Sequence, residues 1–294
     1  MPLTGQNEIT TVIPLYLDSG LPLEKFQKCI ESICKQTLKP IEIIISDDSS
    51  KVDFSEEIKN FMEKITIPYR YIYFPEADGI GSNSNNGLRK VKSKYVHILH
   101  ADDQLANFQV YEKMLKVLIK ENRDWVIAGS LIENRSHFPK YNDFLILGEN
   151  SLGGPSTMFA KTESYLQYDP IFHMMVDVEQ YLRISLKFGA PALILEQLIV
   201  CGVGEWQVQK KLSESEIFTE ISLLKNKHPL IWNQMKKSSE LNLNQRILIL
   251  KIERMQQNAG FFSTDLKILF LMTLIVQKKI LFFFRKKLYL LNIF

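Results

Sequence analysis

Two pairs of adjacent aspartates are the residues of this chain best suited to hold a charged ligand. Asp47 and Asp48 lie in the segment IIISDDSS, and Asp102 and Asp103 lie in the segment YVHILHADD. Two acid pairs at one site would repel each other unless a cation or hydrogen-bond donors lay between them. Carboxylates that follow an apolar strand commonly hold a hard divalent cation against phosphate oxygens. The pairs therefore suggest a site for a metal and a phosphorylated ligand.

A second interpretation of both pairs is structural. SDDSS is rich in residues that form turns and helix N-caps, and ADDQ has the composition to cap a helix that follows it. For the first pair taken alone, the residues support capping and ligand binding about equally. Both interpretations stay open at this point.

The hydrophobic pattern of the first half predicts how these acids are positioned. Short apolar runs alternate with amphipathic ones, which is typical of a βαβ sheet with helices packed against it. We expect strands at residues 9–16, 41–46, 69–74 and 95–99, and helices at residues 23–35, 55–64, 83–91 and 110–121. Ligands of open α/β sheets bind beyond the carboxyl ends of the strands, and both acid pairs fall at that edge.

The second half of the chain has a less regular pattern. We expect a strand at residues 125–132, a loop at 136–150, a turn at 153–155, an apolar stretch at 157–160, a helix at 176–188, one or two strands at 192–203 and a helix at 213–227. The sequence contains no internal repeat and no low-complexity segment.

The net charge of the chain is unevenly distributed. Basic residues exceed acidic ones by 36 − 33 = 3, but residues 261–294 alone hold six basic residues and one acid, a charge of +5. The remainder therefore carries 3 − 5 = −2. A body of that sign is a poor general binder of nucleic acids, because such binding needs clustered Lys and Arg.

The basic tail at residues 261–294 alternates apolar runs with clusters of Lys and Arg. Its longest run without charge, residues 268–277, is much shorter than the ~20 residues that span a bilayer. An interfacial helix on an anionic membrane surface fits this pattern better. The alternative is a helix packed on the rest of the chain or on a partner subunit.

Other chemically capable residues receive structural interpretations. Cys29, Cys34 and Cys201 are odd in number and lack metal-ligand spacing, and the first residues do not resemble a secretory signal, so we expect a reducing, cytoplasmic location. His97 is interpreted as a hydrogen-bonded strand residue. Arg183 is expected to pair with an acid on its own helix.

The order and spacing of eight segments resemble family 2 glycosyltransferases of the GT-A fold. These segments are TVIPLY, an amphipathic helix, IIISDDSS, a second helix, YFPEADGIGSNSNNGL, YVHILHADD, GGPSTMFAK and VDVEQYLR. The resemblance covers about residues 8–210. It implies an α/β catalytic domain at residues 1–210 with a mainly parallel central sheet flanked by helices. A helical extension at residues 211–260 and the basic tail at 261–294 would follow.

The resemblance also implies which residues hold the nucleotide of a sugar donor. Pro14, Tyr16 and Asp48 would contact the base, with Asp47 beside them. Asp48 would accept the imino hydrogen of uracil or thymine, so the donor would be a UDP- or dTDP-sugar.

The resemblance implies that a further set of polar residues binds the sugar and the diphosphate of the donor. Asn83 and Asn85 match a segment that approaches the nucleotide and the sugar. Asp102 would face the ribose and the sugar, and Asp103 would ligate Mn²⁺ or Mg²⁺.

The acceptor side is implied by the second half of the chain. Gly154, Pro155 and Ser156 resemble a segment that lines the sugar pocket. Asp177 matches the catalytic base, and Glu179 is a further site candidate. Positions 177 and 179 lie about 200° apart around a helix, so the two side chains face the same way only if Asp177 still belongs to the loop.

Two departures from the family pattern concern the metal. Relatives often have a histidine where this chain has Gly204, which leaves Glu205 or water to complete the metal shell. His100 replaces an acid before the metal pair and is a candidate neighbour of the site. Trp206 is a candidate to stack on a sugar, or else a core residue.

The function implied is inverting transfer of a sugar to a hydroxyl of a glycan or polyprenyl-linked acceptor, in cell-surface polysaccharide synthesis at the inner face of the cytoplasmic membrane. Charge development at the anomeric carbon resembles that in glycoside hydrolysis. Two alternatives stay open: a catalytically silent GT-A-like binding subunit and, less favoured, a sugar nucleotidyltransferase. The latter needs a Gly-rich, Arg-containing loop after the first strand, and PLYLDSGLPLEKF has none.

Overall fold

The computed structural model describes residues 8–50, 54–207, 213–238 and 241–257. The chain divides into two compact units, the first comprising Met1–Leu145 and Glu149–Ser213 and the second Ile146–Gly148 and Glu214–Phe294. The division into residues 1–210, 211–260 and 261–294 stays a prediction. The basic tail lies outside the described residues.

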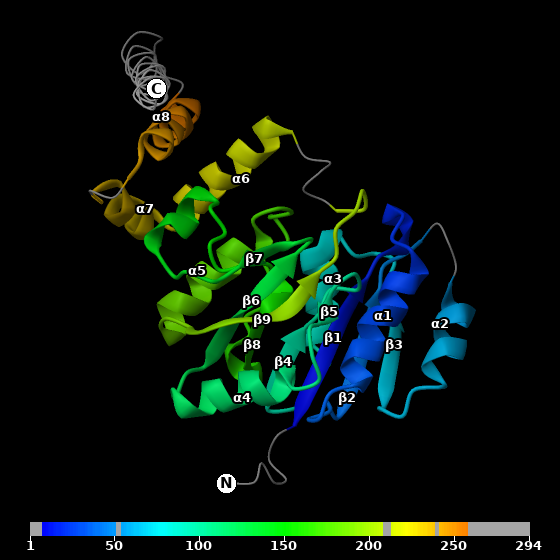
Figure 1. The fold of residues 1–294 in the computed structure, drawn as a ribbon. Coiled ribbons are helices and arrows are strands. Elements are labelled where there is room, and N and C mark those ends of the chain that lie inside the picture. Colours follow the sequence, from blue (N-terminus) through cyan, green and yellow to red (C-terminus); the bar gives the residue numbers. More distant parts are fainter. Residues whose placement is uncertain (1–7, 51–53, 208–212, 239–240, 258–294) are drawn as a thin grey trace, which may run out of the picture. The chain divides into compact units, whose positions relative to one another are not determined.

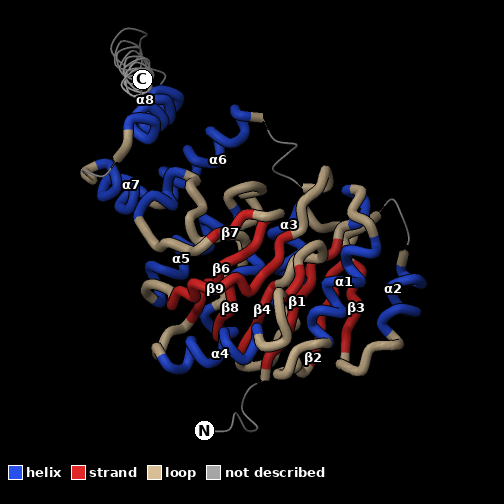
Figure 2. The backbone as a smooth tube through the Cα atoms, viewed as in Figure 1, coloured by secondary structure: helices blue, strands red, loops and turns tan. Residues whose placement is uncertain are grey.

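The first unit is built around one sheet with the strand order β3-β2-β1-β4-β8-β6-β9-β5, and β7 pairs with β6 (Figure 2). One half consists of β1 (Ile9–Leu15), β2 (Glu42–Asp47), β3 (Tyr69–Tyr73) and β4 (Tyr95–Ile98). These strands are parallel, and Val12 lies opposite both Ile44 and Ile98. Because β1 lies between β2 and β4, the carboxyl ends of all three meet at one edge.

The other half of the sheet mixes strand directions. It consists of β5 (Gln104–Leu105), β6 (Trp125–Ile132), β7 (Arg135–His137), β8 (Met158–Lys161) and β9 (Ala192–Cys201). β6 and β9 are parallel, whereas β8 runs antiparallel to β4 and β6, and β5 runs antiparallel to β9. Gln104 pairs with Val200, so the residues after β9 come to lie beside the second acid pair.

In the described part of the first unit, five α-helices accompany this sheet (Figure 1). They are α1 (Leu23–Cys34), α2 (Ser55–Met62), α3 (Gly79–Leu88), α4 (Val110–Lys120) and α5 (Val176–Phe188). α1 and α4 bury apolar side chains spaced three or four residues apart, which gives each helix one apolar face. α3 packs on β1 so closely that a Cβ at Gly87 would lie 2.4 Å from Cγ1 of Val12.

The loops and the second unit hold the remaining helices. Short 3-10 helices lie at Leu17–Ser19, Asp143–Leu147, Pro155–Thr157 and Thr162–Ser164. The second unit contains α6 (Glu214–Lys227), α7 (Pro229–Lys236) and α8 (Leu243–Gln257), and α6 contacts both other helices. Within the described part of the chain, no helix combines the length and apolar character that crossing a membrane requires.

The structure confirms the predicted order of strands and helices and corrects it in three places. α3 begins at Gly79, four residues before the predicted start, and the predicted loop 136–150 contains part of β7 and a 3-10 helix. The segment after Asp103 forms the two-residue strand β5 instead of leading directly into a helix. Such a strand exists only through its pairing with β9, which local sequence does not reveal.

Candidate active site

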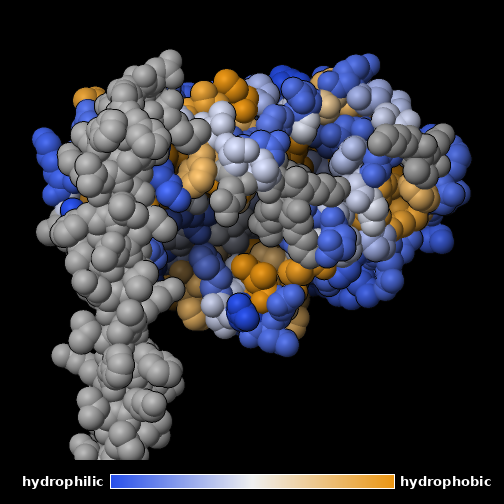
Figure 3. Space-filling model, turned by 90° about the horizontal axis from the view of Figure 1, so that it is seen from above, coloured by the Kyte–Doolittle hydropathy of each residue, from blue (hydrophilic) through white to orange (hydrophobic). Residues whose placement is uncertain are grey.

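The two acid pairs lie at the same edge of the sheet, as predicted. Asp47 is the last residue of β2, and Asp102 and Asp103 follow β4 by a few residues. Figure 3 looks onto this end of the molecule and shows hydrophilic residues with hydrophobic ones interspersed between them.

Both carboxylate oxygens of Asp47 accept hydrogen bonds from within the protein. The backbone N–H and the hydroxyl of Ser49 donate to Oδ1 of Asp47 at 2.9 and 2.6 Å, and the hydroxyl of Tyr71 donates to Oδ2 at 2.6 Å. The turn interpretation of SDDSS therefore describes Asp47. Its predicted place beside the nucleotide stays a prediction.

Asp48 is buried and held from helix α3. Nδ2 of Asn83 donates to Oδ1 of Asp48 at 2.9 Å and to the carbonyl of Leu15 at 3.0 Å. Burial, with a smaller effect of the neighbouring charge of Asp47 in the same direction, raises the pKa of Asp48 to about 7. Oδ1 of Asn83 is buried with no hydrogen-bond partner in the described part of the chain.

The end of β1 lies beside this carboxylate. Pro14 is buried within β1 opposite Ser46, and Tyr16 follows the strand with 42% of its surface exposed. Burial raises the pKa of Tyr16, and the charges of Asp18 and Asp48 add to that effect. Tyr16 is therefore an accessible aromatic ring close to Asp48.

Asn85 lies in a different environment from Asn83. Its Nδ2 donates to the carbonyl of Tyr168 at 2.8 Å, and its Oδ1 accepts the N–H of Tyr168 at 2.7 Å. Both polar groups of the Asn85 amide are thus already hydrogen-bonded to backbone, and the side chain is buried. The contact of Asn85 with the nucleotide and the sugar stays a prediction.

The second acid pair is held by the loop after β9. The N–H of Gly202 donates to Oδ1 of Asp103 at 2.8 Å, and the indole Nε1 of Trp206 donates to Oδ2 of Asp102 at 2.7 Å. A Cβ at Gly202 would lie 2.4 Å from the carbonyl oxygen of Asp102. The approach of this loop to the acids therefore requires glycine at position 202.

His100, Asp102 and Asp103 form a set of side chains that fits a divalent cation. Their ligand atoms lie within 4.8 Å of one another. Burial, followed by the charge of Asp102, raises the pKa of Asp103 to about 7, and burial lowers the pKa of His100. Nε2 of His100 is buried without a hydrogen-bond partner among the described residues. A neutral imidazole with an unsatisfied nitrogen beside two carboxylates is the donor set that a metal would complete.

The ring of Trp206 fills the space at Gly204, the first of the two departures from the family pattern. A Cβ at Gly204 would lie 2.1 Å from Cζ3 of Trp206. Trp206 also packs against the core, with Nζ of Lys25 5.8 Å from its ring centroid. Glu205 is exposed. The ring of Trp206 thus combines a core contact with a hydrogen bond to the acid pair.

The GGPS segment forms hydrogen bonds with the end of β4 and with the residue that follows Leu99. The hydroxyl of Ser156 accepts the N–H of His100 at 2.9 Å, and the carbonyl of Ser156 accepts from Nε2 of His97 at 2.8 Å. Ser156 is buried, Pro155 starts a 3-10 helix, and the carbonyl of Gly154 caps that helix. The structure thus gives Ser156 a supporting contact, and the sugar contact predicted for these three residues stays a prediction.

His97 has the structural role that the sequence predicts. Its ring is fully buried within β4, and burial lowers the pKa of His97 to about 4. The imidazole is therefore neutral at physiological pH.

Asp177 lies in the first turn of α5 and is buried. Nδ2 of Asn150 donates to Oδ2 of Asp177 at 2.6 Å, and the N–H of Val178 donates to Oδ1 at 2.8 Å. Asn150 is in turn fixed by two hydrogen bonds with the backbone of Gly153. Asn150 was not among the predicted site residues, because a single polar residue in an irregular loop gives no signal of its partner.

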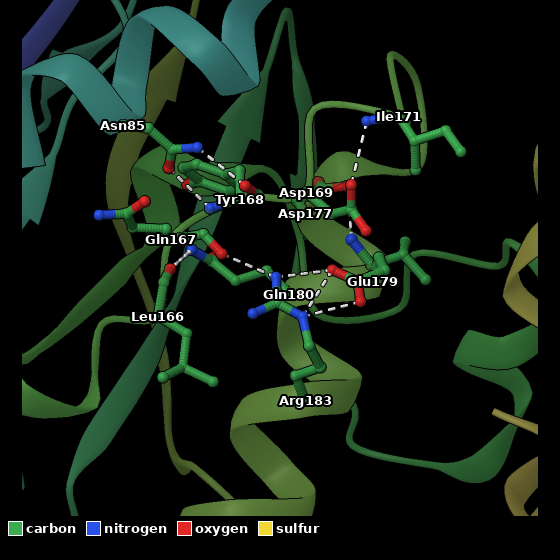
Figure 4. A network of polar contacts seen from close by, with 11 residues as sticks. Asn85, Leu166, Gln167, Tyr168, Asp169, Ile171, Asp177, Glu179, Gln180 and Arg183 are labelled. Atoms are coloured by element: carbon green, nitrogen blue, oxygen red, sulfur yellow. Dashed lines mark hydrogen bonds and ion pairs between the residues drawn. The ribbon is translucent and has the colours of Figure 1, made fainter. Parts of the chain in front are cut away.

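Glu179, the further site candidate, forms an ion pair with Arg183 on its own helix (Figure 4). It is completely buried, and Nε of Arg183 donates to both of its carboxylate oxygens at 2.7 and 2.8 Å. The pairing predicted for Arg183 is confirmed. Because its carboxylate is taken up by this ion pair, Glu179 serves the structure of α5.

Comparisons with known proteins agree with this architecture. The family model described as "Glycosyl transferase family 2" matches residues 10–176. The chain is 29% identical over 146 residues to "Glycosyltransferase GlyA" of Streptococcus pneumoniae serotype 4, covering 49% of this chain and 19% of that protein. It is 30% identical over 133 residues to "GalNAc(5)-diNAcBac-PP-undecaprenol beta-1,3-glucosyltransferase" of Campylobacter jejuni, covering 45% and 41%. The matches thus span less than half the length of either relative.

Solved structures show the same fold. The structure of residues 1–349 of TarS from S. aureus in complex with UDP-GlcNAc superposes with a TM-score of 0.57 at 12% identity, covering 84% of this chain and 72% of that one. The sequence resemblance, the mixed α/β sheet and the family match agree with one another. The chain belongs to glycosyl transferase family 2, a family of enzymes, and has the GT-A fold followed by a helical extension.

Proposed function

We propose that the protein is an inverting glycosyltransferase that moves a sugar from a UDP- or dTDP-sugar to a hydroxyl of a glycan or lipid-linked glycan. The observation that carries this proposal is a short chain of contacts between the predicted base and the predicted metal site. Asn150 binds both Asp177 and Gly153, and Ser156, three residues further on, binds the backbone of His100.

Recognition of the nucleotide is assigned to Asp48 and Tyr16. In its ionised form, Asp48 accepts the imino hydrogen of the pyrimidine, and Asn83 holds the carboxylate in place for that contact. Tyr16 offers an exposed ring beside it. The complex of TarS with UDP-GlcNAc supports a UDP-sugar as the donor.

The diphosphate is assigned to the second acid pair. Asp103, with His100 and Asp102 beside it, would hold Mn²⁺ or Mg²⁺. A bound divalent cation would neutralise charge on the departing diphosphate and orient it. Trp206 and Gly202 keep the two carboxylates oriented toward that position through one hydrogen bond each.

The acceptor is activated by Asp177. Its carboxylate takes the proton of the acceptor hydroxyl while the hydroxyl oxygen bonds to the anomeric carbon and the bond to the diphosphate breaks. A single displacement without a covalent intermediate inverts the configuration. Asn150 fixes the orientation of the carboxylate for this step.

The acceptor and the location follow from the relatives and from the tail. The C. jejuni relative is named for an undecaprenol-linked acceptor, which supports a polyprenyl-linked glycan here. The basic, apolar composition of residues 261–294 supports peripheral binding to the inner face of the cytoplasmic membrane. Both features fit a role in cell-envelope polysaccharide synthesis.

A substitution at Asp177 tests the proposal. A panel of nucleotide sugars is assayed with and without Mn²⁺ for the parent protein, for Asp177→Asn and for the control Asp124→Asn. Asp124 lies directly before β6, and its carboxylate pairs with Lys161. We expect Asp177→Asn to reduce turnover roughly 10²–10⁴-fold, the usual contribution of a general base, with UDP binding unchanged. The control should retain activity.

The other outcomes separate the alternatives. Turnover that Asp177→Asn leaves undiminished would refute this residue as the base. Binding of a nucleotide sugar without turnover of any member of the panel would identify a binding subunit. Formation of a nucleotide sugar from a nucleoside triphosphate would identify a nucleotidyltransferase.

A further inference from the structure

Three consecutive backbone carbonyls before α5 are each held by a different side chain (Figure 4). Gln180 donates to the carbonyl of Leu166, and Nη2 of Arg183 donates to that of Gln167 at 2.7 Å. Nδ2 of Asn85 donates to the carbonyl of Tyr168 at 2.8 Å. Two of these donors belong to α5 and the third to α3, so this segment joins the two helices.

The contact made by Asn85 differs in kind from the other two. Asn85 also accepts the N–H of Tyr168 at 2.7 Å, so its amide forms two hydrogen bonds with one backbone residue. Two bonds fix both the position and the orientation of that residue, whereas one bond leaves it free to rotate. Tyr168 is itself buried, and its hydroxyl lies 3.1 Å from that of Tyr165.

A close approach of the helices accompanies this clamp. A Cβ at Gly81, one turn before Asn85 on α3, would lie 3.0 Å from Cγ2 of Val176 and 3.3 Å from Cβ of Tyr168. Val176 is the residue directly before Asp177. The first turn of α5 is therefore packed directly against α3.

The same helix also braces the nucleotide edge. Asn83, two residues before Asn85, binds Asp48 and the carbonyl of Leu15. Positions two apart lie about 200° apart around a helix, so the two asparagines serve opposite sides of α3. One side of α3 supports the nucleotide site, and the other supports the segment that leads into α5.

We propose that Asn85 is a positioning residue for Asp177: it fixes Tyr168, and through Tyr168 and Val176 it sets where the first turn of α5 stands relative to the donor. This inference rests on the proposed role of Asp177 as the base. A general base must reach its proton within hydrogen-bond distance, and a misplacement of about 1 Å can cost on the order of 10²-fold in rate. Asn85 therefore acts on the rate of transfer and leaves donor affinity intact.

The test uses the full chain and two substitutions at one position. Asn85→Ala removes both hydrogen bonds, and Asn85→Asp keeps the acceptor for the N–H of Tyr168 but turns the donor into an oxygen that repels the carbonyl. The matched control is Asn86→Ala, which removes a neighbouring buried amide whose Nδ2 donates to the hydroxyl of Ser46 in β2 at 2.9 Å. The measurements are kcat, donor KM, the Kd for UDP, the pH profile of kcat and thermal unfolding.

We expect both Asn85 variants to lower kcat about 10- to 100-fold and to shift the acidic limb of its pH profile, with the Kd for UDP within about twofold of the parent. Asn86→Ala should lower thermal stability and keep kcat within about threefold. The readout is the difference between the effect on kcat and the effect on the Kd for UDP. If Asn85→Ala does not fold, the same comparison is made with Asn85→Asp.

Three results would overturn the inference. The first is a kcat within threefold of the parent for the Asn85 variants. The second is UDP binding weakened tenfold with kcat retained, which would make Asn85 a donor contact. The third is an equal loss of kcat in Asn86→Ala, which would make the effect one of general packing. Asp177→Asn in the same assays tests the proposed base separately, since its retained activity would refute the base whatever Asn85 does.

Discussion

The pairs Asp47–Asp48 and Asp102–Asp103 look alike in sequence and are built in different ways. Asp47 is held by Ser49, two residues away, and by Tyr71 on the neighbouring strand. Asp102 and Asp103 are held by Trp206 and Gly202, which lie 104 and 99 residues away in the chain. The first pair is thus organised by its own turn and the adjacent strand, whereas the second depends on the pairing of β5 with β9.

The two pairs share one electrostatic feature. Burial is the largest cause that raises the pKa of Asp48, and likewise that of Asp103, to about 7. A buried carboxyl with a raised pKa loses its charge more readily than an exposed one, so a ligand that needs the charged form must supply a donor or a cation. Two motifs that look alike in sequence can therefore owe their geometry to contacts of very different sequence separation.

The largest effect is expected at the second pair. Asp103→Asn should lower metal-dependent turnover by roughly 10²–10⁴-fold, because a cation on the diphosphate is worth several kcal/mol of charge stabilisation. Electron paramagnetic resonance of Mn²⁺ with the purified protein gives the affinity independently of turnover. Asp47→Asn, the same chemical change at the other pair, serves as the control. An unchanged Mn²⁺ affinity in Asp103→Asn would remove this residue from the metal site.

An intermediate effect is expected from pH at Asp48. The pKa of Asp48 is raised to about 7 by burial, so the carboxyl is protonated at lower pH and cannot accept the imino hydrogen. Uridine, which carries no phosphate to titrate, should therefore bind more weakly by up to about tenfold for each pH unit below 7, and its affinity should rise by no more than about twofold from pH 7 to 8. Titration calorimetry or ligand NMR measures this. Asp48→Asn should abolish the slope, and a flat profile in the parent between pH 5 and 8 would contradict the assignment.

The smallest effect on binding is expected at Asp47. Asp47→Ala should keep uridine affinity within about threefold while lowering the free energy of unfolding by about 1–3 kcal/mol, since it removes the acceptor for the buried donors of Ser49 and for the half-buried hydroxyl of Tyr71. Urea denaturation measures the loss. Ser49→Ala, which removes one donor and keeps the acid, should cost less. A strong loss of uridine affinity without loss of stability would assign Asp47 to the ligand.

The fold was predictable because its signals are local. Apolar runs with turn residues after them define β1 to β4, and the acids that follow them mark the ligand edge. The ion pair of Glu179 with Arg183 follows from a spacing of four residues on one helix.

The rest of the site depends on contacts between distant segments. Asn83 and Asn85 occupy similar positions in GIGSNSNNGL, and only the packing of α3 sends one to Asp48 and the other to Tyr168. Asn150 lies in a loop without periodicity, yet it orients Asp177. Contacts of this kind become visible only when the partner segments are placed in space.

The close contact between Gly204 and the ring of Trp206 means that positions 204 and 206 cannot be substituted independently. Any side chain at 204 meets the ring of Trp206, so a histidine can enter there only after that ring has gone or moved. Losing the ring also removes the N–H that holds Asp102. Substitutions at 204 and 206 are therefore epistatic. A library that varies position 204 alone should return mostly glycine, whereas one that varies both positions together can return larger side chains at 204.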